Sequence, residues 1–138
     1  MKGKGGDIDL RAVYGDAQDA IENNVANLTS ESFNTNVIII AHLTYQTTPE
    51  GIKAYPQGVG QKLSPKIPQY FPNVMWYTHK GGKYVIKTNS TPLVDLAHTA
   101  PFEMGNEYDT GDGLAKIFEV LRGKHEEKVT PIKTARRV

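Results

Sequence analysis

The sequence predicts an α/β fold with a mostly parallel sheet, a C-terminal β-hairpin and flanking helices. Three observations lead to this prediction: a long apolar helical stripe near the N-terminus, a run of β-branched residues after it, and two strand-like segments around a Gly-Gly pair. A long helix that leads into a continuously apolar strand is the building unit of α/β proteins, whose parallel strands are buried on both faces. The 138 residues are enough for one domain.

The first predicted element is a helix over residues 10–28, because apolar side chains recur there at steps of three and four. Asp7 or Asp9 can cap its N-terminus. Gly15 weakens the helix by up to ~1 kcal/mol without breaking the pattern. The polar residues 29–35 end it. The stripe consists of Leu10, Val13, Tyr14, Ala17, Ile21, Val25 and Leu28.

The next predicted element is a buried strand over residues 36–42, which read Asn-Val-Ile-Ile-Ile-Ala-His. Unbroken apolarity indicates that both faces of the strand are covered, as in the centre of a parallel sheet. Residues 43–57 are polar and Thr-rich without a clear period, which predicts a long loop. Such loops are usually functional or mobile, and this one leaves the strand end at which α/β proteins bind ligands.

The second half of the chain predicts short elements. Residues 58–71 favour a broken helix, with Ser64 as cap and Pro65 at its first position, because Pro65 and Pro68 interrupt a longer one. Residues 73–79 and 83–88 predict a hairpin around Lys-Gly-Gly. A short strand over residues 91–96 precedes an irregular stretch that reaches Thr110. A last helix over residues 113–122 begins after Asp112 and stops at Gly123.

Composition excludes several classes of protein. The 16 Lys and Arg nearly balance the 15 Asp and Glu, which argues against a uniformly basic nucleic-acid binder. The absence of cysteine excludes disulfides, thiolate zinc sites and a cysteine nucleophile. The longest apolar run, residues 37–41, is far shorter than the ~20 residues that span a bilayer. We therefore expect a soluble cytoplasmic protein with no membrane partner.

The basic residues are concentrated at the C-terminus. Residues 122–138 hold six basic and two acidic residues, a net charge of +4 on an otherwise mildly acidic chain. We expect a folded domain over residues 1–123 and a basic tail over residues 124–138. Such a tail either contacts a phosphate backbone or an acidic partner, or is simply solvated.

Common catalytic motifs are missing. The segment Gly58-Val59-Gly60-Gln61-Lys62-Leu63-Ser64 has the wrong spacing for a phosphate-binding loop, and no Gly-x-Gly-x-x-Gly occurs. The four histidines are scattered and form no ligand pair, so no metal site is predicted. No serine lies in a Gly-x-Ser-x-Gly elbow.

Four segments nevertheless carry a resemblance to a known family. Residues 36–42, 58–63, 83–88 and 111–117 resemble the second half of a RecA-like (P-loop NTPase type) ATPase core, closest to phage nucleotide-binding proteins of recombination and single-strand annealing. The resemblance covers residues 8–123. It implies a partial RecA-like α/β domain and, for a phage protein, the host cytoplasm.

The resemblance implies a role for several residues of the first half. His42 matches the polar strand end that senses the γ-phosphate of ATP; otherwise it is a histidine satisfied by backbone groups. Residues 43–57 match the position of a mobile DNA-contacting loop. Lys53 and Lys62 would then bind phosphates and Tyr55 would stack on a base, or this stretch is an ordinary surface loop.

Three further residues receive roles from the resemblance. Lys87 matches the basic residue that completes a neighbouring subunit's ATP site, where a cation stabilises the transferred phosphoryl group. Lys83 lies on the same face of the predicted strand and would bind the nucleotide. Tyr108 matches a position near the adenine. The alternative for the lysines is a solvated strand surface.

The chain departs from this family in one important way. The phosphate loop and the magnesium-binding aspartate precede the opening helix in the family, and both are missing here. ATP and Mg²⁺ are therefore implied by the resemblance only, and we expect neither to be bound by this chain alone. A half core exposes a sheet edge and an apolar face, so we expect a homo-oligomer or a partner chain that supplies the N-terminal half.

Two functions follow from these observations. The first is the C-terminal part of a RecA-like ATP-binding protein in DNA recombination, with a γ-phosphate sensor, a DNA-contacting loop and a subunit interface. The second is a non-catalytic module that binds single-stranded nucleic acid or a protein. A small structural or assembly protein is a third, weaker reading.

Overall fold

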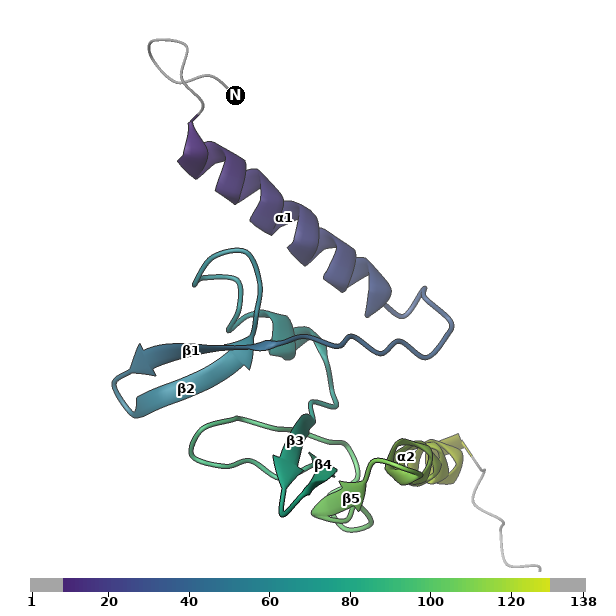
Figure 1. Cartoon of the computed structure of the whole chain (residues 1–138). Helices are drawn as coiled ribbons and strands as arrows, with labels where there is room; N and C mark the ends of the chain where they lie inside the picture. The colour runs from purple at the N-terminus through teal and green to yellow at the C-terminus, as the bar shows by residue number, and fades with distance from the viewer. Residues whose placement is uncertain (1–8, 130–138) are drawn as a thin grey trace, which may run out of the picture. The chain divides into compact units, whose positions relative to one another are not determined.

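The computed structural model describes residues 9–129 and shows an α+β fold (Figure 1). Its described strands form two sheets, one of two strands in the order β1-β2 and one of three in the order β3-β4-β5. Every strand pair is antiparallel. The elements are α1 (Leu10–Leu28), β1 (Leu43–Thr48), β2 (Gly51–Pro56), the 3₁₀ helix η1 (Ile67–Tyr70), β3 (Trp76–Lys80), β4 (Lys83–Lys87), β5 (Glu107–Asp109) and α2 (Gly113–Val129).

The predicted parallel sheet, and with it the partial RecA-like core, is therefore wrong. A parallel sheet needs strands joined by long crossover connections, usually helices. Tight turns join β1 to β2 and β3 to β4, and β5 pairs antiparallel with β4 after the longer connection of residues 88–106. The strand order in each sheet follows the order along the chain.

The chain divides into two compact units. Unit 1 comprises Met1–Phe71 together with Pro92–Val94, and unit 2 comprises Pro72–Thr91 together with Asp95–Val138. Pro92–Val94 belong to unit 1 because the amide of Ala54, in β2, donates a hydrogen bond of 2.8 Å to the carbonyl oxygen of Leu93.

Helix α1 has the predicted limits. Asp9 caps it, since its carboxylate accepts hydrogen bonds from the amides of Arg11 and Ala12 at 3.1 and 3.3 Å. The C-terminal part of the predicted stripe is packed in unit 1, where Val25 lies in a buried cluster with Leu63 and Ile67. The N-terminal part of the stripe is exposed, with Leu10 at 64% and Tyr14 at 57%.

The strand predicted over residues 36–42 is wrong. These residues form no strand, and the side chains of the run are largely outside the core: Ile38 is 54% exposed, Ile39 43% and Ile40 91%. The preference of β-branched residues for strands reflects packing on a covered, pleated surface rather than an intrinsic backbone property. Since no described strand pairs with this run, its composition alone does not make it a strand.

The loop predicted over residues 43–57 is also wrong, because β1 and β2 form a hairpin there. The pairing runs from Leu43 opposite Pro56 to Thr48 opposite Gly51. Gly51 has a φ of 121°, and the hydroxyl of Thr48 donates a 2.8 Å hydrogen bond to its carbonyl oxygen. Threonine and tyrosine favour strands, so a Thr-rich segment can pair without an apolar face.

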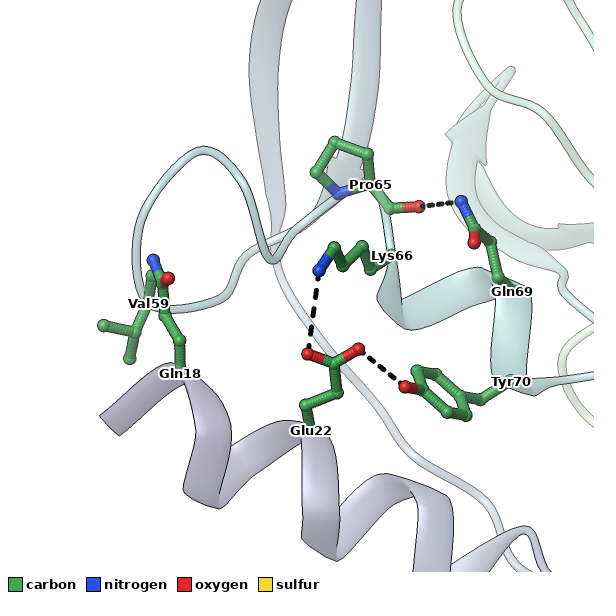
Figure 2. Close-up of polar contacts among 7 residues, drawn as sticks. All are labelled: Gln18, Glu22, Val59, Pro65, Lys66, Gln69 and Tyr70. Atoms are coloured by element: carbon green, nitrogen blue, oxygen red, sulfur yellow. Dashed lines mark hydrogen bonds and ion pairs between the residues drawn. The ribbon is translucent and has the colours of Figure 1, made fainter. Parts of the chain in front are cut away.

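Residues 58–71 are broken as predicted, into turns and the short η1. Ser64, which is 1% exposed, does not cap η1; its hydroxyl oxygen accepts a 3.1 Å hydrogen bond from the amide of Gly58. Three contacts connect this segment to α1. The side-chain amide of Gln18 donates to the carbonyl oxygen of Val59 at 2.7 Å, and Glu22 contacts both Tyr70 and Lys66 (Figure 2).

The hairpin predicted around residues 80–82 is confirmed as β3 and β4. Lys80 pairs with Lys83 across a two-residue turn. Gly81 and Gly82 have φ values of 56° and 81°, the left-handed pair that a tight hairpin turn requires and that glycine adopts without strain.

The segments after this hairpin differ from the prediction. Residues 91–96 form no strand; Val74 makes a single bridge with Ala97 instead. The stretch predicted to be irregular contains β5, which pairs with β4 from Val85 opposite Asp109 to Lys87 opposite Glu107.

The last helix begins at Gly113 as predicted, but it continues past Gly123 to Val129. It therefore includes the first residues of the predicted basic tail, and residues 130–138 of that tail lie outside the described residues. Ile117, 1% exposed, packs in a cluster with Ile86, Ala100 and Met104 and so joins α2 to the central strand of the three-stranded sheet. No helix in the described part of the chain is long and apolar enough to cross a membrane.

Candidate nucleic-acid interface

Three aromatic rings gather on one face of the β3–β4 hairpin. His79 lies opposite Tyr84, and Tyr77 lies opposite Ile86, so these side chains share a face. The rings of Tyr77 and Tyr84 are stacked, with centroids 5.2 Å apart and planes inclined by 14°. His79 meets Tyr84 edge-on, with centroids 5.1 Å apart. We call Tyr77, His79 and Tyr84 the ring cluster.

The ring cluster is accessible because Tyr77 and His79 come from the edge strand β3 and Tyr84 lies close to the turn. Tyr77 is 59% exposed and Tyr84 is 54% exposed. The part of the same face on the central strand β4 is covered at Ile86, which is buried in a cluster with Ile117 and Met104. This buried residue packs the sheet on its core, so the hairpin presents its rings on a fixed support.

Three lysines come from the opposite face of the same two strands, two of them beside the turn. Lys80 and Lys83 face each other next to the turn. The ammonium of Lys80 lies 3.1 Å from the carboxylate of Glu107, in β5. Lys87 lies opposite Trp76, and its ammonium is 5.3 Å from the centre of the indole ring. Among the described residues, Lys83 forms no ion pair, so its charge is available to a ligand.

This arrangement combines the two features that bind single-stranded nucleic acid. Exposed aromatic rings provide surfaces on which unpaired bases stack, and lysines near them neutralise phosphates. The lysine stem is long and flexible, so an ammonium beside a two-residue turn can reach past the edge of the hairpin.

Of the residues predicted from the sequence, Lys83, Lys87 and Tyr108 lie in unit 2. Lys83 and Lys87 share one face of β4, as predicted. Tyr108 lies opposite Ile86 in β5, where it is half-buried against the core, and its hydroxyl accepts a 2.8 Å hydrogen bond from the amide of Gly105. Their roles toward ATP stay predictions.

The other predicted residues lie in unit 1. The side chain of His42 is exposed, and its carbonyl oxygen accepts a 2.6 Å hydrogen bond from the amide of Gln57. Lys53 and Tyr55 share a face of β2, opposite Gln46 and Thr44. Lys62 is exposed in the turns before η1. Their roles as sensor and DNA contacts also stay predictions.

A shallow hollow of about 280 Å³ lies beside Tyr108, lined by Glu107, Asp109, Asp112 and Lys116. Lys116 donates to the carboxylate of Asp112 at 2.8 Å; this hydrogen bond lowers the pKa of Asp112 and raises the pKa of Lys116. Carboxylates outnumber ammonium groups here, so the hollow repels a nucleotide phosphate. Within residues 9–129, no cluster of three or more His, Asp or Glu could hold a metal ion.

No protein-family model, no curated protein and no solved structure matches this chain. The assignment of the candidate site therefore rests on the geometry of its residues alone.

The sequence reasoning missed two members of the ring cluster, Tyr77 and His79. It gave no function to Tyr84, the third member. The signal was available, because a two-residue Gly-Gly turn fixes the register and places His79 opposite Tyr84.

Proposed function

We propose that the β3–β4 hairpin binds single-stranded nucleic acid, with bases stacked on the ring cluster and a phosphate held by Lys83. The observation that carries the proposal is the exposed, stacked pair of Tyr77 and Tyr84 beside the lysines of the turn. The function is that of a binding module and needs no hydrolysis of ATP.

The exposed rings favour a single strand over a duplex. Bases in a duplex are already paired and stacked on each other, and a protein ring reaches their faces only when they are splayed out. Stacking of one base on one aromatic side chain contributes about 1–3 kcal/mol. Two exposed tyrosines can therefore hold about two bases, which predicts weak binding for one chain and tighter binding for several chains along one strand.

The experiment measures, by fluorescence anisotropy at about 50 mM salt, how the protein binds a fluorescein-labelled oligothymidylate of about 15 nucleotides. This length is enough for the usual single-strand site. We expect Tyr77→Ala and Tyr84→Ala each to weaken binding by about 5- to 150-fold, the equivalent of one lost stack. Tyr84→Phe keeps the ring and is expected to bind like the wild type.

Tyr45→Ala is the matched control, because Tyr45 is a 62% exposed tyrosine on the β1–β2 hairpin. Equal losses for Tyr45→Ala and Tyr84→Ala, or equal affinity for the single strand and a duplex, would overturn the proposal. An oligouridylate of the same length distinguishes DNA from RNA. Lys53→Gln and Lys62→Gln test the predicted contacts of unit 1 in the same assay.

A further inference from the structure

His79 is the member of the ring cluster that can carry a positive charge near neutral pH, because histidine ordinarily changes charge between about pH 5 and 8. Its side chain is exposed, and its ring meets the ring of Tyr84 edge-on. Among the residues that the structure describes, none forms a hydrogen bond or an ion pair with either ring nitrogen of His79. Both nitrogens are therefore open to a ligand that reaches the ring cluster.

The face of the sheet that holds the ring cluster has no other strand side chain that is charged near neutral pH. The strand register places on it Tyr77 and His79 from β3, Tyr84 and Ile86 from β4, and Tyr108 from β5. The charged side chains of the three strands besides His79 lie on the opposite face: Lys80, Lys83, Lys87, Glu107 and Asp109. Since β3 is an edge strand that pairs with β4 alone, Tyr84 is the titratable group that faces His79 across the strands.

We propose that protonated His79 binds a phosphate of the same single strand, so that the protein binds nucleic acid more strongly at acidic pH. This inference rests on the proposed function, because the bases must be stacked on the rings. A base stacked on Tyr77 or Tyr84 brings its phosphates to the face that His79 shares, whereas the ammonium groups of Lys80 and Lys83 reach around the hairpin from the opposite face. At alkaline pH the strands offer those phosphates no positive charge on this face, and at acidic pH the imidazolium provides one.

The surroundings of His79 accommodate the charge. The ring of Tyr84, with its centroid 5.1 Å from that of His79, attracts a cation. Lys80 and Lys83 repel one, but the ammonium of Lys80 lies 3.1 Å from the carboxylate of Glu107. Helix α2 contributes apolar side chains to the cluster that covers Ile86: Ile117, Val120 and Leu121. A bound phosphate opposes the repulsion by the lysines, so protonation of His79 and binding of the strand strengthen each other.

The experiment repeats the anisotropy measurement with the labelled oligothymidylate at about pH 5.5 and at about pH 8, on either side of the ordinary titration of histidine. One additional phosphate contact makes the slope of log affinity against log salt steeper by about 0.7. We therefore expect the wild type to show a slope about 0.7 steeper at the acidic pH. At about 50 mM salt it is expected to bind about 1.5- to 5-fold more tightly there, which is what one exposed ion pair contributes.

Three variants show whether His79 is the group responsible. His79→Gln keeps a polar side chain without the charge, and its slope is expected to be the same at both pH values. His79→Arg is charged at both, so the steeper slope is expected at both. His42→Gln is the matched control, because His42 is exposed in unit 1, and it is expected to keep the wild-type difference.

The outcomes separate this inference from the proposed function. The role of His79 is refuted by equal wild-type slopes at the two pH values, by a pH difference that persists in His79→Gln, or by its loss in His42→Gln. In each of these cases Tyr77→Ala still weakens binding, and the ring cluster keeps its proposed function. A wild type that binds no single strand at either pH would refute both.

Discussion

Removal of one carboxylate is expected to strengthen the binding of single-stranded nucleic acid. Glu107 holds the ammonium of Lys80 through both its oxygens, at 3.1 and 3.3 Å. While this ion pair exists, Lys80 cannot replace the counterion of a phosphate. Glu107→Gln keeps the size and shape of the side chain and releases Lys80 toward the ligand.

The size of the change in salt dependence follows from the number of phosphates that the protein contacts. Each phosphate contact with a single strand contributes about 0.7 to the slope of log affinity against log salt. One additional lysine therefore adds about 0.7 to that slope, so that a rise from about 50 to 200 mM salt weakens binding about 2.5-fold more than in the wild type. The lost ion pair is exposed and stabilises the fold by only about 0–1 kcal/mol.

The assay is fluorescence anisotropy with the labelled oligothymidylate at several salt concentrations. Asp109→Asn is the matched control, because it removes one negative charge from the same face of β5, and Asp109 lies opposite Val85 rather than a lysine. Equal slopes for Glu107→Gln and Asp109→Asn would mean that only the overall charge matters. A slope for Glu107→Gln at or below that of the wild type would refute the role of Lys80.

Three further predictions concern the fold that supports this surface. Leu63→Ala is expected to lower the free energy of unfolding by about 2–5 kcal/mol in urea, because Leu63 is 2% exposed, whereas Leu63→Met should cost less than about 1.5 kcal/mol. Gly82→Val is expected to destabilise the hairpin by about 1–2 kcal/mol, since Gly82 has a φ of 81°, while Gly81→Asn retains the turn; thermal unfolding compares the two. Lys116 lowers the pKa of Asp112, so this ion pair stabilises the fold above the ordinary carboxyl pKa, and the stabilisation is lost as the pH falls through the lowered pKa of Asp112. A carbon NMR titration should show that the pKa of Asp112 is higher in Lys116→Gln than in the wild type. An unchanged pKa would contradict the contact.

The local elements of the chain could be predicted where the apolar pattern agrees with the capping or turn residues at the ends of the segment. Helix α1 has an unbroken stripe and an acidic cap at Asp9, and both act within the segment itself. The β3–β4 hairpin has two alternating strands around Gly81 and Gly82, which fixes its register. Neither prediction depends on the rest of the chain.

The sheet architecture could not be predicted, because it depends on which segments pair with each other and not on the composition of one segment. The run of residues 37–41 has the composition of a buried parallel strand, yet no described strand pairs with it. The Thr-rich β1 has a weak signal and is nevertheless paired through its whole length with β2. A residue pattern shows which face of a segment would be buried if another segment packed on it. Whether another segment does pack there depends on the rest of the chain.

The candidate site was predicted in part for a similar reason. Lys83 and Lys87 were identified on one face of a strand, which a period of two fixes. Their role was assigned from a resemblance, and the rings of Tyr77 and His79 on the other face were left out. Pairing of the two strands, rather than either strand alone, creates the ring cluster.

The hydrogen bond between Ala54 and Leu93 has a consequence for any attempt to dissect the chain. Because Pro92–Val94 return to unit 1, the polypeptide passes from one unit to the other three times. A fragment that ends at Phe71 would remove the partner of the Ala54 amide, in a residue that is only 4% exposed. The two units alternate along the sequence, so no single cleavage releases unit 1 with all of its parts.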